Sequence, residues 1–108
     1  MKVVNYLEVE PVRELPGVVM REVITAEEAP RFYMSVYELE PGGATSIHAH
    51  WWEHELFILS GQGLIDTGQE KIPISQDKVI FMVPDEPHGF INNGNHPLRY
   101  ILLNPRNR

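Results

Sequence analysis

The sequence predicts an all-β domain, either a sandwich or a barrel, on three observations. Runs rich in β-branched and aromatic residues are short and recur about every ten residues. Most of these runs end at turn-forming segments, among them Pro41-Gly42-Gly43, Gly61-Gln62-Gly63 and Pro84-Asp85-Glu86-Pro87. The spacing leaves no room for the long helical crossovers that connect parallel strands. An α/β fold is therefore excluded.

Nine segments of this kind are expected to form strands, and one short segment is a candidate helix. The helix would begin at Thr25, which could cap it together with Glu28 three residues later, but Pro30 would end it within about one turn. In chain order, the expected strands are residues 17–24, 31–40, 44–50, 54–60, 63–68, 71–75, 78–83, 88–93 and 98–104.

Length, charge and composition limit the function classes. The 108 residues, with 43% hydrophobic and 22% charged, are expected to form one globular domain over 1–108. A net charge of −6 without a basic run argues against nucleic-acid and anionic-membrane partners. No apolar stretch reaches the roughly 18 residues of a membrane span, and the N-terminal segment lacks the apolar core of a signal peptide, so a cytoplasmic protein is expected. The absence of cysteine excludes thiolate ligands and cysteine nucleophiles.

Histidine spacing indicates a metal site. The segment IHAHWWEH (47–54) holds three of the five histidines. On a strand, His48 and His50 would point to the same face and could bind one cation together. His54 could return to the same cavity after a chain reversal, and His88 follows the rigid Pro87 at the start of a later strand. The alternative is a histidine-rich surface tract. His96, in a turn before a proline, is expected to have no functional role.

Glu53 and Glu55, which flank His54, are expected to be solvated on the outer face, because they are out of phase with the even-numbered histidines. The alternative is that one of them coordinates the metal or accepts the second N–H of a ligand histidine.

The aromatic residues near the histidines are expected to be structural. Trp51 and Trp52 are expected to pack at a strand corner or subunit interface rather than to form a substrate platform. Core packing is likewise expected for three residues that could alternatively line the cavity, namely Phe81, Phe90 and Tyr100.

The order of these residues resembles the cupin superfamily over roughly residues 31–103. The first cupin motif, Gly-x5-His-x-His-x3–4-Glu-x6-Gly, is matched at about 42–61 by Gly42, His48, His50, His54 and Gly61. Every spacing fits, and His54 occupies the position where most cupins have Glu. The chain therefore resembles the small single-domain cupins with four histidines, of the cupin 2 conserved-barrel type.

The second cupin motif, Gly-x5-Pro-x-Gly-x2-His-x3-Asn, lies at about 77–92 and is degraded in its turn residues. Asp77, Val83 and Asp85 stand in place of Gly, Pro and Gly, whereas His88 and Asn92 are retained. An aspartate at the third position of the turn 83–86 favours type I, whereas glycine would permit type II.

The resemblance implies a double-stranded β-helix, the jelly-roll barrel, with one divalent metal bound by His48, His50, His54 and His88. Manganese is expected first, with iron, nickel, copper and zinc as alternatives. Four neutral imidazoles leave the full +2 charge on the ion, so the open positions should favour an anionic small-molecule ligand.

Two classes of function follow. The first is a metalloenzyme that carries out oxygenase-type or Lewis-acid chemistry on a small organic substrate, in the manner of cupin dioxygenases, isomerases or decarboxylases. The second is a non-catalytic, metal-dependent ligand-binding or sensor domain. The sequence does not identify catalytic residues or the substrate. A homodimer is expected, with the strand VVMREVI (18–24) pairing with the sheet of a second subunit.

Overall fold

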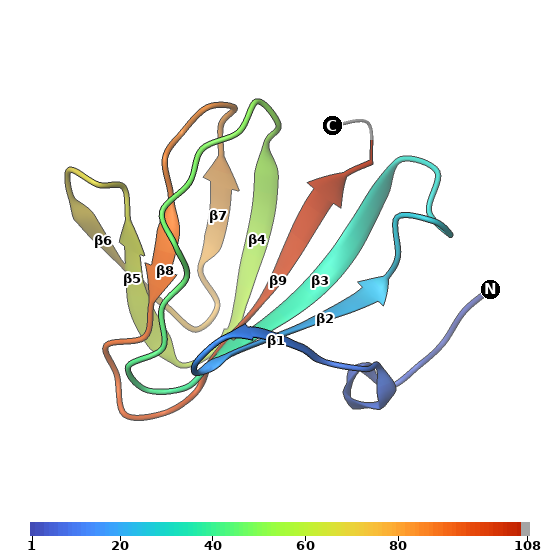
Figure 1. Ribbon diagram of the computed structural model, residues 1–108, viewed down its shortest axis with the longest axis horizontal. Helices are drawn as coiled ribbons and strands as arrows, with labels where there is room; N and C mark the ends of the chain where they lie inside the picture. Colours follow the sequence, from blue (N-terminus) through green and yellow to red (C-terminus); the bar gives the residue numbers. More distant parts are fainter. Residues whose placement is uncertain (107–108) are drawn as a thin grey trace.

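The computed structural model describes residues 1–106, which contain nine strands in two antiparallel sheets and one short 3-10 helix (Figure 1). The elements are η1 (Tyr6–Glu8), β1 (Val12–Leu15), β2 (Val18–Ile24), β3 (Phe32–Leu39), β4 (His54–Ser60), β5 (Gln62–Asp66), β6 (Lys71–Ser75), β7 (Val79–Met82), β8 (Gly89–Ile91) and β9 (Leu98–Pro105).

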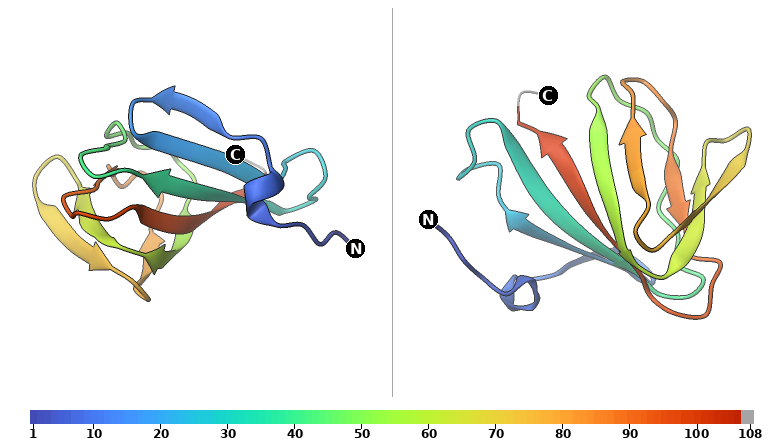
Figure 2. Two further views of the ribbon diagram at one scale, coloured as in Figure 1. Left: turned by 90° about the horizontal axis from the view of Figure 1, so that it is seen from below. Right: turned by 180° about the vertical axis from the view of Figure 1, so that it is seen from behind.

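The strands form a jelly roll, as the sequence predicts. A six-stranded sheet in the order β1-β2-β3-β9-β4-β7 faces a three-stranded sheet in the order β6-β5-β8. The two sheets diverge from a shared lower end, where several turns connect them, and they open toward the top of the view (Figures 1 and 2).

The core between the two sheets is formed by side chains that alternate along the strands between buried and exposed positions. In β4, Leu56 and Ile58 are buried, whereas the intervening Phe57 is exposed. Tyr100 and Leu102 of β9 face the same core and meet Phe90 and Ile65 from the small sheet. Burying an aliphatic or aromatic side chain of this size contributes about 1.5–3 kcal/mol, so the core is the main source of stability.

Asn92, at the end of the second motif, anchors the turn after β8 to the end of β3. Its side chain is 1% exposed. The amide Nδ2 donates to the carbonyls of Leu39 and His96, both at 2.8 Å, and Oδ1 accepts from the N–H of Gly94 at 2.9 Å. A buried amide with all three bonds satisfied fixes the end of β8 against β3 and the 92–96 turn.

Residues 44–50, predicted to be a strand, do not form a regular one. The segment runs beside β8 but has only two isolated bridges, Ala44 to Ile91 and His48 to His88. Thr45 interrupts the ladder, because its hydroxyl, rather than a main-chain carbonyl, accepts the N–H of Phe90 at 2.8 Å. The other eight predicted strands correspond to β2 through β9.

The predicted helix at 25–30 is a turn. The capping interactions form, with Thr25 N–H donating to Glu28 Oε2 at 2.7 Å and Glu28 N–H donating to Thr25 Oγ1 at 3.3 Å. Pro30 prevents the turn from continuing as a helix. Two elements, η1 and β1, were not predicted. β1 was missed because it is four residues long, carries charged residues and lies between Pro11 and Pro16.

Two further expectations are wrong. Asp85 has φ +67°, which excludes the type I turn expected at 83–86 and matches the third position of type II. Asp77 likewise adopts the left-handed conformation of the glycine that it replaces, with φ +72°.

Phe81 is 56% exposed rather than in the core, because the neighbouring Met82 takes the inward position.

The 18–24 segment cannot supply a free edge to a second subunit. As β2, it pairs with β1 on one side and with β3 on the other. The unpaired edges of the six-stranded sheet are β1 and β7.

Candidate metal centre

The four motif histidines come from two parts of the chain that the fold brings together. His48 and His50 lie on the segment between β3 and β4, His54 is the first residue of β4, and His88 immediately precedes β8. They line one pocket between the two sheets, with a volume of about 190 Å³. The remaining lining residues are Tyr33, Tyr37, Thr45, Trp52, Phe90, Tyr100, Leu102 and Asn104.

Each of these histidines bonds through Nδ1 to a main-chain carbonyl. The acceptors are Ser46 O for His48 at 3.0 Å, Trp52 O for His50 at 2.9 Å, Leu103 O for His54 at 3.0 Å and Glu86 O for His88 at 2.8 Å. A carbonyl can only accept, so each Nδ1 carries the proton. In the neutral ring, the proton-free lone pair is then on Nε2.

The nitrogens available for a metal lie close together. Ligand atoms of His48, His50 and His88 all lie within 4.8 Å of one another. His54 adjoins this group through His50, with the two Nε2 atoms 3.0 Å apart. Two proton-free nitrogens at that distance repel each other, and a cation bound between the rings would remove the repulsion. This donor set therefore fits a divalent transition metal.

Burial keeps two of the rings neutral. His54 is 4% exposed, and burial, followed by the effect of the neighbouring histidines, lowers its pKa from 6.5 to about 4 despite the opposing bond to Leu103. Burial also lowers the pKa of His88, which is 3% exposed. Near neutral pH these two histidines are unprotonated and able to coordinate a metal. His48, by contrast, is exposed and marks the open side of the pocket.

Aromatic rings surround the histidines. Trp52 stacks on His50, with ring centroids 3.9 Å apart and planes 3° from parallel. Tyr37, Tyr100 and Phe90 form a second stack, with centroid distances of 5.2 Å and 4.5 Å. Trp52 therefore forms part of the pocket wall, whereas Trp51 is 57% exposed and outside the pocket lining.

Neither glutamate beside His54 contacts the centre. Glu53 and Glu55 are exposed and line an outer pocket with Arg31 and Phe32. Because a main-chain carbonyl takes every Nδ1–H of the four motif histidines, the alternative in which Glu53 or Glu55 accepts such a proton is wrong. His96 is exposed on its turn, away from the pocket lining.

Sequence reasoning missed several polar residues of the pocket, namely Tyr33, Tyr37, Thr45 and Asn104. Tyr33 and Tyr37 were within reach of prediction, because they share the inward parity of β3 with the buried Leu39. Asn104 was within reach for the same reason, because it ends the expected strand 98–104 and shares the parity of the buried Tyr100 and Leu102.

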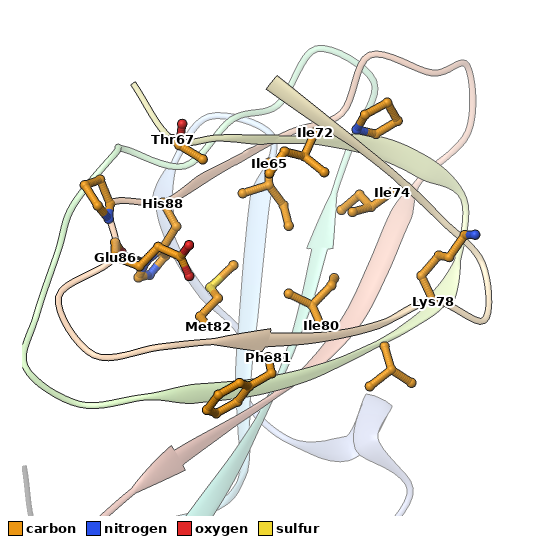
Figure 3. A pocket seen from close by; sticks show the side chains of 13 residues that line it. Ile65, Thr67, Ile72, Ile74, Lys78, Ile80, Phe81, Met82, Glu86 and His88 are labelled. Carbon is orange, nitrogen blue, oxygen red and sulfur yellow. Dashed lines mark hydrogen bonds between the residues drawn. The ribbon is translucent and has the colours of Figure 1, made fainter. Parts of the chain in front are cut away.

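A larger cavity lies on the other side of His88, between β6 and β7 (Figure 3). Its volume is about 400 Å³, and its walls are mainly aliphatic, with Ile65, Ile74, Ile80 and Met82 pointing into it. Among the residues that the structure describes, His88 alone lines both this cavity and the histidine pocket.

Among residues 1–106, no helix is both long and apolar enough to span a membrane.

Comparison with known proteins identifies the family. The cupin domain family matches residues 35–104, the region that holds both motifs and all four pocket histidines. The chain is a cupin. The solved structure of the polyketide cyclase RemF from Streptomyces resistomycificus superposes with a TM-score of 0.91, at 30% identity, over 100% of this chain and 81% of that one.

Other similar proteins have different functions. (S)-ureidoglycine aminohydrolase from Arabidopsis thaliana is 28% identical over 98% of this cupin, which spans only 37% of that protein's length. An oxalate-binding protein from Thermotoga maritima is 32% identical over 67 residues, which cover 61% of this cupin and 55% of that protein. A predicted oxalate decarboxylase structure from the same organism has a TM-score of 0.80 at 26% identity and covers 94% of this cupin and 96% of that chain.

Proposed function

We propose that this cupin is a metal-dependent enzyme that uses Lewis-acid chemistry on a small organic substrate with carbonyl or enolate oxygens. His48, His50, His54 and His88 would hold one divalent ion. The observation that carries the proposal is the set of four Nδ1–H bonds to main-chain carbonyls, which leaves the opposite nitrogen of each ring as a donor. A bound divalent ion would polarise a substrate oxygen.

The residues of the chain would contribute binding and orientation. The Nδ1 bonds hold the rings in place, and the stacked Trp52 fixes His50. Tyr33, Tyr37 and Asn104 supply polar groups that could hydrogen-bond substrate oxygens. Among the side chains that the structure describes, the pocket lining has no carboxylate, lysine or arginine beside the histidines. This scarcity of protein acid–base groups favours Lewis-acid chemistry over isomerisation by paired bases.

Manganese is the first expectation for the metal, with iron, nickel, copper and zinc as alternatives. An all-imidazole set by itself suits zinc, copper, iron and nickel. With no carboxylate ligand, the ion would keep its full charge and favour an anionic group in its open positions. The relatives described by their names as an oxalate-binding protein and a polyketide cyclase are consistent with an oxygen-rich ligand.

A second candidate is a non-catalytic protein that binds a small anion through the metal. The relative named as an oxalate-binding protein, which matches 61% of this chain, favours it.

The test begins with protein purified without a histidine tag. We expect about one divalent ion per chain after dialysis, and an ion content near zero for His50→Ala. The loaded protein is then assayed with oxalate, ureidoglycine, phenolics and carbonyl acids by following ammonia release, carbon dioxide release and oxygen uptake. Turnover that His50→Ala abolishes supports the enzyme. Anion binding without turnover supports the second candidate, and a wild-type protein that holds no metal rejects both.

A further inference from the structure

A third cavity adjoins the histidine pocket on the side of the β1–β2 hairpin. Its volume is about 260 Å³. Tyr37, Thr45 and His48 line both this cavity and the histidine pocket, so the two meet at the exposed His48. We call this cavity the vestibule. Its remaining lining residues are Val12, Leu15, Val18, Met20 and Ser46.

An irregularity in β1 makes the vestibule wall apolar. Val12 pairs with Met20 and Leu15 pairs with Val18, with a shift of register between the two pairs. Residues three apart on a regular strand point to opposite faces. The shift instead turns both Val12 and Leu15 toward the vestibule, beside their partners on β2. Such irregularities in strand pairing commonly re-aim side chains near binding sites.

The two adjoining cavities differ in chemistry. The histidine pocket offers imidazoles, two tyrosines and an asparagine, which suit oxygen-bearing groups. Among the side chains that the structure describes, the vestibule lining has no acidic, lysine or arginine group and presents four aliphatic or thioether side chains. Taken together, the volumes fall within the roughly 300–1,000 Å³ typical of small-molecule sites. At the junction, Tyr37 stacks with Tyr100 and offers a flat ring surface.

We propose that the vestibule binds the apolar ring system of a planar aromatic substrate whose hydroxyl and carbonyl oxygens reach the histidines. The substrate class is then an aromatic hydroxy- or keto-compound rather than a small hydrophilic acid such as oxalate. This assignment rests on the proposed function, because the metal would bind the oxygen-bearing end. It goes further by giving the apolar wall that β1 contributes a role, which is to contact the aromatic rings of the substrate.

The cavity between β6 and β7 is the competing place for an apolar group (Figure 3). It is larger, but of the described residues it shares only His88 with the histidine pocket, whereas the vestibule shares three. A ligand bound to the histidines therefore has a broader connection to the vestibule. The competing cavity supplies a matched control.

The experiment compares two ligands with similar chelating groups, 3-hydroxy-2-naphthoate and oxalate, titrated calorimetrically into zinc-loaded protein. The vestibule variant is Val12→Gln with Leu15→Gln, both 39% exposed in the wild type. The control variant is Ile72→Gln, which is 42% exposed and lines the β6–β7 cavity. Because all three side chains are partly exposed, both variants should fold, and thermal melts check this.

We expect the vestibule variant to bind hydroxynaphthoate about tenfold more weakly and oxalate with unchanged affinity, while the control variant binds both like the wild type. An equal loss for oxalate, or no loss for hydroxynaphthoate, overturns the assignment. A loss confined to the control variant places the ring between β6 and β7 and also overturns it.

The failure of the proposed function gives a different result. If the wild type holds no metal, that function fails, and the same titration on chelator-treated protein still tests the vestibule. Residual naphthoate binding must then weaken in the vestibule variant, and absence of any naphthoate binding rejects the assignment.

Discussion

At the scale of single residues, His54 occupies the position where most cupins have a glutamate. Of its neighbours, Glu55 lies on the opposite face of β4, and Glu53 precedes the strand. His54 is buried in the pocket, whereas Glu55 is exposed and pairs with Leu103 and Phe81 on the outer face. We predict that His54→Ala lowers the metal content well below one ion per chain, because it removes one of the four donors. Glu55→Ala should leave the content unchanged. Metal analysis after equilibrium dialysis measures both, and the reverse order would show that a glutamate is the ligand.

The same histidine gives a pH dependence. Its pKa is about 4 in the folded protein, below the ordinary value of 6.5. The unfolded chain therefore binds more protons below pH 6.5, so the stability of metal-free protein is complete above that pH and falls as the pH drops toward 4. A shift of this size is worth at most about 3 kcal/mol, and burial of His88 acts in the same direction.

We predict a steeper loss for metal-loaded protein, because protons also compete with the ion for every imidazole. Metal should leave cooperatively near pH 5 by this argument, with the melting temperature falling in step. The measurement is a series of thermal melts from pH 7.5 to 4 on loaded and chelator-treated samples. Parallel curves would mean that the histidines hold no metal that stabilises the fold.

Some features of this centre could be predicted from the sequence, and others could not. The four histidines were found because their spacing matches two motifs. The carbonyls that accept their Nδ1–H bonds could not be predicted. Every residue has a main-chain carbonyl, and only the fold determines which carbonyl lies next to a given imidazole ring. The left-handed conformations of Asp77 and Asp85 were hidden for a related reason. Aspartate tolerates several turn types, so the residue alone does not determine φ.

At the scale of elements, the strands that were predicted correctly carry alternating or continuous apolar runs bounded by turns. β1 was missed because it has only four residues, two of them charged, between Pro11 and Pro16, and because it depends on pairing with β2. Residues 44–50 have a strand-like pattern, but the Thr45 hydroxyl replaces a ladder carbonyl. Local pattern thus predicts a tendency to extend, while pairing partners decide whether a regular ladder forms.

Two glycines with similar backbone conformations differ in how closely the rest of the chain packs against them. Gly61 and Gly68 both have positive φ, at 85° and 89°. A Cβ at Gly61 would overlap the carbonyl of Pro97, whereas a Cβ at Gly68 meets nothing within 4 Å. Positive φ costs an alanine about 1–2 kcal/mol at either site. We predict that Gly68→Ala shows only this loss and that Gly61→Ala loses at least about 2 kcal/mol more. Urea denaturation measures the free energy of unfolding of both variants. Equal losses would mean that the β4–β5 turn shifts to accommodate the added Cβ at little cost.

At the scale of the whole molecule, the outer face of β4 and β7 is unusually apolar. Val79 is 74% exposed and Phe57 is 41% exposed, and the two pair across the strands. Phe81 adds to the same face. Large exposed apolar patches on small proteins commonly mark association surfaces, and identical chains associate most often as two-fold dimers.

We predict a homodimer through this face, with a mass of about twice 12.4 kDa by light scattering at micromolar concentration. Val79→Glu should shift the mass toward the monomer, because the charge would be desolvated at the interface. Val3→Glu, at a position 85% exposed near the N-terminus, serves as the control. A wild-type mass near 12.4 kDa would contradict the prediction.

The hydrogen bonds from the four Nδ1 atoms to main-chain carbonyls also affect how this centre can evolve. Substitution at Ser46, Glu86 or Leu103 leaves the accepting carbonyl in place as long as the backbone keeps its path. Trp52 differs, because its ring also stacks on His50. Neutral drift at the other three positions can therefore change the surroundings of the histidines while the rings keep their orientation. Selection on the donor set then acts on the histidines, on Trp52 and on the turns that set the backbone. A lineage with this architecture can exchange its pocket walls, and hence its substrates, while the arrangement of donors is inherited unchanged.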